Sequence, residues 1–200
     1  MRVHANTLGL AALLIAPSEA RELTVADVTP QAVACVFSKA CAVTPTDSYG
    51  VVKLFGDGGA GRLLTRTYPG LPGTPAAGLT GYSLQLDMSA STALGTANCV
   101  EKLTIDTGPL AALPYGKGGN AEVFVVSGQG ARPTSVTQSG TKVTFSFAKP
   151  VCPAAHNGRQ NWATSSLYFG FAAKGAPVPA KAQVTGTMDG TATDVRVPKH

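Results

Sequence analysis

Residues 82–88 read Tyr-Ser-Leu-Gln-Leu-Asp-Met, and every second side chain in this stretch is apolar. Successive side chains of a β-strand point to opposite faces, so this alternation predicts a strand with one face in a core and the other in water. A shift of one residue in the pairing would turn the apolar set into solvent, and the register of such a strand is therefore well specified. Residues 142–147, Lys-Val-Thr-Phe-Ser-Phe, repeat the pattern.

The same alternation recurs along the chain and predicts an all-β fold. The expected strands are 23–25, 49–55, 82–88, 101–106, 122–126, 142–147, 167–171, 182–188 and 194–197, of which 23–25, 49–55 and 182–188 are the weaker candidates. Turn signals at 138–140 and 188–190 close two hairpins. No stretch after residue 20 sustains a period of 3.6, which argues against βαβ units. We expect an antiparallel β-sandwich, jelly-roll-like, with about nine strands, and long connections at 56–81 and 148–163.

The composition suits short strands joined by many turns. Charged residues make up only 14% of the chain, which holds 23 glycines and 14 prolines. Glycine and proline set turn dihedrals and are poor helix formers. Because 44% of the residues are hydrophobic, disorder is not expected either. The formal net charge of +5 is spread along the chain without a run of three basic residues, so no nucleic-acid partner is expected.

Residues 1–20 have the pattern of a secretory signal peptide. Arg2 supplies a positive start, 8–16 is apolar, and Ser18-Glu19-Ala20 places small residues at the −3 and −1 positions of a cleavage site. The apolar stretch is too short to span a bilayer. An ordinary N-terminal helix is the alternative. We expect a single secreted β-sandwich domain over 21–200, a secreted or periplasmic location, and no membrane insertion after cleavage.

Four cysteines form an even set, which in an exported protein favours two disulfides. Three connectivities are possible. We favour Cys35–Cys41 as a local loop and Cys99–Cys152 as a long staple, because Cys99 precedes one predicted strand and Cys152 follows another. Metal sites need CxxC-type spacing or neighbouring histidines, and the chain offers neither convincingly. No metal and no cofactor are expected.

Three motifs resemble a family of secreted bacterial proteins that often carry a C-terminal sorting anchor of the PEP-CTERM type. They are 66–79 followed by Tyr82, Asn98-Cys99-Val100, and 166–172 with a closing Arg196-Val197-Pro198. The resemblance spans most of residues 50–198. It implies an extracellular β domain and no particular chemistry. The chain ends at Lys199-His200 without an anchor helix or basic tail, so retention by sorting is not expected.

Trp162 and its polar neighbours Arg159, Gln160 and Asn161 are the candidate ligand-binding residues. An aromatic plane beside amide and guanidinium donors can stack on a sugar ring and bind its hydroxyls. The alternative is a tryptophan that fills the core. An extracellular glycan or cell-surface material is the partner that such a platform would take.

Signals for catalysis are weak. His156 is the one internal histidine of the expected mature chain, in which His200 is the last residue, and no GxSxG elbow presents a serine to His156. Glu101 and Glu122 could lie on adjacent strands as a carboxylate pair. Asp57, in a glycine-rich turn, could offer an oxygen ligand to calcium, with a simple turn as the alternative.

The sequence therefore predicts a non-enzymatic extracellular structural or adhesive module. The alternative is a carbohydrate- or ligand-binding domain that uses Trp162 and the long loops.

Overall fold

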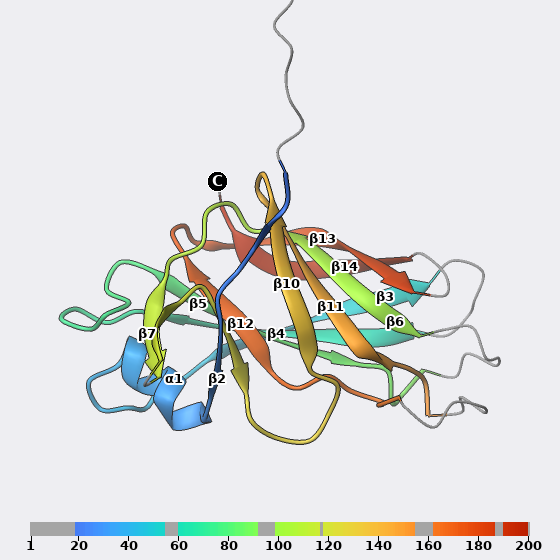
Figure 1. Ribbon diagram of the computed structural model, residues 1–200, viewed down its shortest axis with the longest axis horizontal. Helices are drawn as coiled ribbons and strands as arrows, with labels where there is room; N and C mark the ends of the chain where they lie inside the picture. The colour runs from blue at the N-terminus through green and yellow to red at the C-terminus, as the bar shows by residue number, and fades with distance from the viewer. Residues whose placement is uncertain are drawn as a thin grey trace, which may run out of the picture.

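The computed structural model describes residues 19–54, 60–91, 99–116, 118–154, 162–186 and 190–199, and the predicted all-β class is confirmed there (Figure 1). The strands are β1 (Arg21–Glu22), β2 (Val25–Val28), β3 (Thr46–Leu54), β4 (Ala60–Pro69), β5 (Thr80–Asp87), β6 (Val100–Asp106), β7 (Leu113–Gly116), β8 (Gly119–Ala121), β9 (Val123–Val126), β10 (Pro133–Ser139), β11 (Lys142–Val151), β12 (Phe169–Ala173), β13 (Pro177–Gly186) and β14 (Gly190–Pro198). One helix, α1 (Pro30–Phe37), completes this part of the chain.

Hydrogen bonds connect twelve of the described strands into one curled sheet. Their order is β1-β10-β11-β6-β13-β14-β3-β4-β5-β12-β9-β2, and β7 and β8 form a separate two-stranded sheet. All pairs are antiparallel except β2 with β9, which is parallel. The prediction of a purely antiparallel sheet is therefore wrong at this one pair. The cause is that β2 continues directly from β1 and must run beside β9 in the direction that β1 sets.

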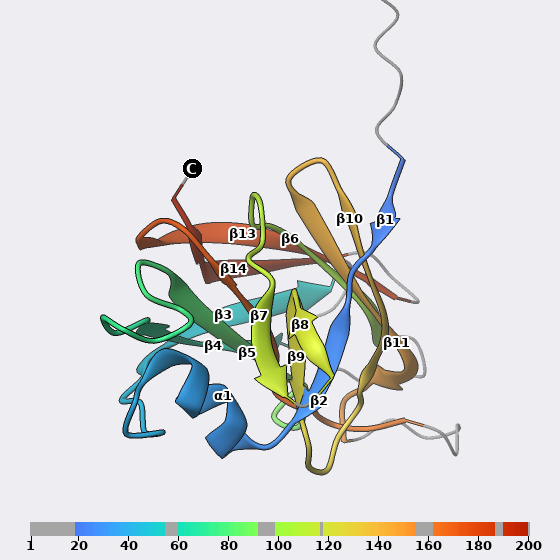
Figure 2. The same ribbon diagram turned by 60° about the vertical axis from the view of Figure 1, so that its left-hand side comes forward.

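The curled sheet is closed by the N-terminal strap, which we define as residues 21–28. The two ends of the strand order, β1 and β2, are separated in the chain only by Leu23 and Thr24. One short segment thus pairs with β10 at its start and with β9 at its end, as Figure 2 shows. The strap covers both edges of the sheet, which would otherwise expose unpaired backbone groups.

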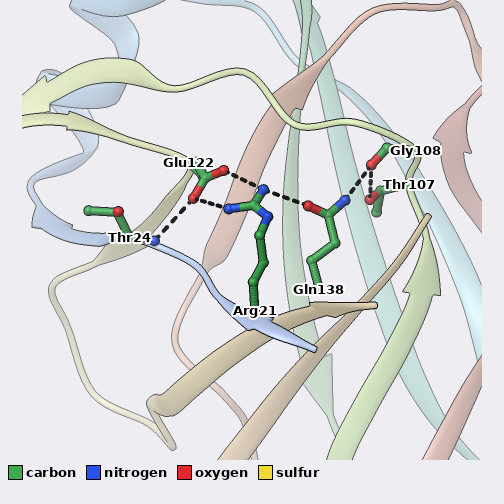
Figure 3. Close-up of polar contacts among 6 residues, drawn as sticks. All are labelled: Arg21, Thr24, Thr107, Gly108, Glu122 and Gln138. Atoms are coloured by element: carbon green, nitrogen blue, oxygen red, sulfur yellow. Dashed lines mark hydrogen bonds and ion pairs between the residues drawn. The ribbon is translucent and has the colours of Figure 1, made fainter. Parts of the chain in front are cut away.

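A polar network holds the strap where the two edges meet (Figure 3). Arg21 donates to both carboxylate oxygens of Glu122, over 3.1 Å from Nη1 to Oε2 and 2.6 Å from Nη2 to Oε1. Its Nη2 also donates to Oε1 of Gln138 over 2.7 Å, and Gln138 Nε2 donates to the carbonyl oxygen of Gly108 over 2.9 Å. The backbone N–H of Thr24 donates to Glu122 as well. The hydrogen bond from Arg21 is the main cause that lowers the pKa of the Glu122 carboxyl.

The inner core lies inside the curl and contains the apolar sets that the alternation predicts. Tyr82 stacks on Phe171 with ring centroids 5.3 Å apart, and Phe145 meets Phe169 at 4.6 Å. The predicted inward residues that are buried here are Tyr82, Leu84, Leu86, Met88, Leu103, Ile105, Val143, Phe145, Phe147, Phe169, Phe171, Val195 and Val197. The register inferred from period two is therefore confirmed for these strands.

A second core, which the sequence did not predict, covers the outer face of β4, β5, β12 and β9. Helix α1 and the β7–β8 hairpin pack onto this face. The ring of Phe37 from α1 meets Tyr68 edge-on at 4.8 Å, and Tyr115 from β7 lies 5.0 Å from Phe124. Strands β9 and β12 therefore bury side chains on both faces, in keeping with the four consecutive apolar residues 123–126.

Helix α1 was missed because its eight residues are too few to show a sustained period. Its start carries an ordinary N-terminal signature. Thr29 is the N-cap and its Oγ1 accepts a hydrogen bond from the N–H of Ala32 over 3.2 Å, while Pro30 occupies the first turn. Val33, Val36 and Phe37 then form the buried stripe.

The expected connection 56–81 is also wrong in part, because β4 occupies its middle. The glycine-rich residues before this strand and the proline-rich residues after it hid a short alternating segment. Five strands, β1, β4, β7, β8 and β10, account for the excess over the nine predicted. At the second expected connection, 148–163, β11 extends to Val151.

Both favoured disulfides are present. Cys35 pairs with Cys41 and ties α1 to the segment that follows it. Cys99 pairs with Cys152, beside the backbone pair Val100 and Val151 of the neighbouring strands β6 and β11. In the chain-entropy model, a bridge over 53 residues stabilises the fold by about 4 kcal/mol. The two disulfides indicate an oxidising, extracytoplasmic environment.

Candidate ligand-binding cleft

Two aromatic residues that line a cleft beside α1 pack over glycines on the outer face of the sheet. Gly81 on β5 and Gly170 on β12 lie under aromatic rings of the second core. A Cβ at residue 81 would lie 2.4 Å from Cε2 of Tyr68, and a Cβ at residue 170 would lie 2.6 Å from Cζ of Phe124. Neither position tolerates a side chain without moving a ring. The rings of Tyr68 and Phe124 therefore pack directly over these two glycines.

The cleft has a volume of about 310 Å³ and runs between α1 with the segment after it and the outer face of the sheet. Its wall is mostly apolar. The lining residues are Pro30, Val33, Ala34, Val43, Pro45, Arg66, Tyr68, Ser83, Phe124, Val126 and Tyr168. Small-molecule sites typically measure roughly 300–1,000 Å³ and combine an apolar wall with a few polar groups, so this cleft meets both conditions at the lower size limit.

Arg66 is the charged residue of the lining, and two neighbours fix its position. Its Nε lies 3.2 Å from Oδ1 of Asp47, the residue directly opposite on β3. Its guanidinium carbon lies 4.9 Å from the ring centroid of Tyr168. Nε is buried and makes no well-aligned hydrogen bond, so the contact with Asp47 is an ion pair only. Cation–π and ion-pair contacts together hold the side chain at the cleft.

Two hydroxyl-bearing residues of the lining sit deeper on the same face. Tyr68 is buried, and this burial raises the pKa of its phenol, while the nearby Arg66 charge opposes the shift. Ser83 on β5 is directly opposite Arg66 in the register of β4 with β5, and it is also buried. The phenol of Tyr68 keeps its proton at neutral pH and can act as a hydrogen-bond donor.

Tyr115 lies next to this group but does not line the cleft. Its hydroxyl is buried and has no hydrogen-bond partner within the described ranges. Burial, and to a smaller extent the neighbouring Tyr68, raise the pKa of the Tyr115 phenol. A buried hydroxyl without a partner loses its hydration without compensation and destabilises the fold.

The site residues expected from the sequence lie apart from this cleft. Trp162 is half-buried, precedes the bridge between Ala163 and Val151, and does not line the cleft. Its neighbours Arg159, Gln160 and Asn161 lie outside the described residues, so the platform stays a prediction. His156 and Asp57 also lie outside them.

The expected carboxylate pair is not formed. Glu101 lies on β6, whose neighbours are β11 and β13, whereas Glu122 directly precedes β9, whose neighbours are β12 and β2. The idea of adjacent strands is therefore wrong. Glu122 pairs with Arg21 of the strap instead. Glu122 lies near β1 because the sheet closes on itself. The alternation of apolar residues along single strands carries no information about this closure.

Arg66 was not among the site residues predicted from the sequence, although the residues around it have the pattern of a strand. Residues 63–68 read Leu-Leu-Thr-Arg-Thr-Tyr, in which threonines alternate with Arg66 and Tyr68. Threonine favours strands, so the segment could have been identified as a strand with both residues on one face.

Within the ranges that the structure covers, no group of three or more histidine, cysteine, aspartate or glutamate side chains is placed to hold a metal ion. No helix in the same ranges has the length and apolarity that a bilayer crossing requires. In comparisons with known proteins, no family model, no curated protein and no solved structure matches this chain.

Proposed function

We propose that this chain is an extracytoplasmic, non-enzymatic β domain that binds a small ligand in the cleft between α1 and the curled sheet. The cleft itself carries the proposal. It joins an apolar wall of helix and sheet residues to one fixed cation, Arg66, and to buried hydroxyls. This combination is typical of a site that recognises the shape of a ligand and a single polar group on it.

The proposed location rests on the two disulfides and on the leader-like pattern of residues 1–20. Disulfides persist in secreted and periplasmic proteins and are rare in reducing compartments. Secretion and cleavage after Ala20 are part of the proposal. The resemblance to secreted bacterial proteins with sorting anchors points the same way and stays a prediction. The finer description of the curled sheet as a jelly-roll-like sandwich is likewise proposed.

Binding is favoured over catalysis by the kinds of groups that line the cleft. Arginine is permanently charged. Burial raises the pKa of Tyr68 further above neutrality, so this phenol stays protonated at neutral pH. General acid–base catalysis needs groups with a pKa near the working pH, and these two side chains do not provide one.

A structural or adhesive role is the second candidate, and the strap favours it. Because residues 21–28 pair with both edges of the sheet, the domain forms a closed shell that two disulfides reinforce. Such a shell suits a module that must stay folded outside the cell. A glycan platform around Trp162 would make this module adhesive.

The ligand-binding proposal is tested with 3-phenylpropan-1-ol, a neutral apolar probe small enough for the cleft. We expect it to bind with a dissociation constant of about a millimolar or below, and amide resonances of Val33 and Val126 to shift during the titration. Ser83→Leu fills the cleft from the sheet side and should weaken binding about tenfold or more.

Ser135→Leu is the matched control, because Ser135 is a half-buried strand serine on β10, away from the cleft. It should leave the affinity unchanged. Absence of saturable shifts in the wild-type protein would overturn the proposed function, and so would equal binding by the Ser83→Leu variant.

A further inference from the structure

We infer that the ligand of the cleft is a small amphipathic carboxylate, whose single negative charge pairs with Arg66 while its apolar body lies against α1 and the sheet. The inference rests on the proposed function and names the chemical class that the site would take. Three features of Arg66 carry it: the Nη groups that its two fixing contacts do not need, the partial neutralisation by Asp47, and the apolar surroundings.

The two contacts that fix Arg66 do not depend on its Nη groups. The contact with Asp47 occupies Nε, and the face of the guanidinium lies over Tyr168. The ion pair is closest at Nε and the ring contact involves the face of the guanidinium, so neither contact needs Nη1 or Nη2. The side chain is 38% exposed, so these groups remain accessible. Two parallel N–H donors on a planar guanidinium match the two oxygens of a carboxylate.

The local charge favours one negative charge on the ligand over two. Asp47 already neutralises part of the Arg66 charge at 3.2 Å. No other lysine, arginine or histidine lines the cleft within the described ranges. A phosphate monoester carries close to two negative charges near neutral pH and needs more cationic groups than this site holds. A carboxylate carries one and suits a single arginine.

The apolar residues of the lining determine which hydrophobic group the ligand can carry. Val33 and Ala34 of α1 form one wall, and Phe124 and Val126 of β9 form another. An alkyl or aryl group of about ten carbon atoms would bury apolar surface on both sides. The ring of Tyr168 fixes the guanidinium in advance, so little side-chain freedom is lost when the carboxylate binds. The ordered arginine and the apolar walls together favour an acid with a compact hydrophobic body.

The test compares 3-phenylpropanoate with 3-phenylpropan-1-ol, which differ only at the head group. In the wild-type protein, we expect the acid to bind about tenfold more tightly than the alcohol, the advantage that a charge-assisted bidentate contact provides. Arg66→Gln should remove this advantage, so that acid and alcohol bind the variant with equal affinity. Arg62→Gln, on the same face of β4 but outside the cleft, is the matched control and should preserve the advantage.

Asp47→Asn should increase the preference for the acid, whereas Arg66→Gln should remove it. It removes the carboxylate that competes for Arg66, so the ratio of acid affinity to alcohol affinity should rise several-fold. This variant keeps the inference testable if Arg66→Gln proves too unstable to purify. Equal affinity for acid and alcohol in the wild-type protein would overturn the inference and leave the proposed function intact. Binding of neither probe would overturn both, and tighter binding of 2-phenylethyl phosphate than of the acid would overturn the assignment to a monoanion.

Discussion

Arg21 and Glu122 form an ion pair between the two edges of the curled sheet, with Nη2 of Arg21 2.6 Å from Oε1 of Glu122. Arg21 belongs to β1, which pairs with β10, and Glu122 directly precedes β9. The two residues are 101 positions apart in the sequence. Their contact, together with Gln138, holds the strap across the line where the sheet closes. The first residues of the domain therefore complete a structure built by the rest of the chain.

Arg21→Gln should lower the free energy of unfolding by about 1 kcal/mol, since it removes a two-pronged hydrogen bond that solvent screens only in part. Urea unfolding followed by circular dichroism measures the change. Arg132→Gln is the control, because the ion pair of Arg132 with Asp27 is exposed on both sides and should contribute little. Equal effects of the two substitutions would show that the closing pair has no special role.

The contribution of Glu122 to the free energy of unfolding should decrease as the pH falls. The hydrogen bond from Arg21 lowers the pKa of this carboxyl in the folded protein below its ordinary value of 4.5. The stabilisation is therefore fully present above that ordinary value and is lost as the pH falls through the folded value. The difference in unfolding free energy between wild type and Glu122→Gln, measured from pH 7 down to about pH 3, should shrink on acidification. A constant difference over this range would contradict the role of the charge.

Tyr115→Phe should stabilise the protein by about 1 kcal/mol, because it removes a buried hydroxyl that has no partner in the described structure. Tyr82→Phe is the matched comparison. The hydroxyl of Tyr82 donates to the carbonyl oxygen of Gly175 over 3.2 Å, so its removal should destabilise by a similar amount. Thermal unfolding of the two variants measures both effects. Destabilisation of the Tyr115→Phe variant would mean that this hydroxyl has a partner after all.

The two disulfides should contribute unequally to the free energy of unfolding. Replacing Cys99 and Cys152 with alanine opens a loop of 53 residues and should reduce stability by about 4 kcal/mol. The same change at Cys35 and Cys41 opens a loop of 6 residues and should cost about 2 kcal/mol in the same model. Denaturant unfolding of the two double variants shows which disulfide stabilises the fold more. The reverse order would show that strain or local packing, and not chain entropy, sets the contribution of each bridge.

The inner core could be predicted from the sequence because it depends on a local rule. Residues such as Leu84 and Phe145 occupy every second position of their strands. This alternation alone is enough to identify which face of a strand is buried. The disulfides followed from similar reasoning, since Cys99 and Cys152 flank strands that pair. The class of the fold and much of its register were therefore available before the structure.

The closure and the cleft could not be predicted, because both depend on contacts between distant segments. The strap is only eight residues long, and nothing in Arg21 itself points to Glu122. The rings of Tyr68 and Phe124, which line the cleft, pack over Gly81 and Gly170, and this match between four strands is not encoded by period two. The hidden alternation around Arg66 was the one local signal, and the flanking glycines and prolines masked it.

The most direct test of the ligand-binding account is a crystal structure of the oxidised protein soaked with 3-phenylpropanoate. The account predicts electron density for the phenyl ring between Val33 and Val126, with the carboxylate against the Nη groups of Arg66. Density beside Trp162 with an empty cleft would contradict it.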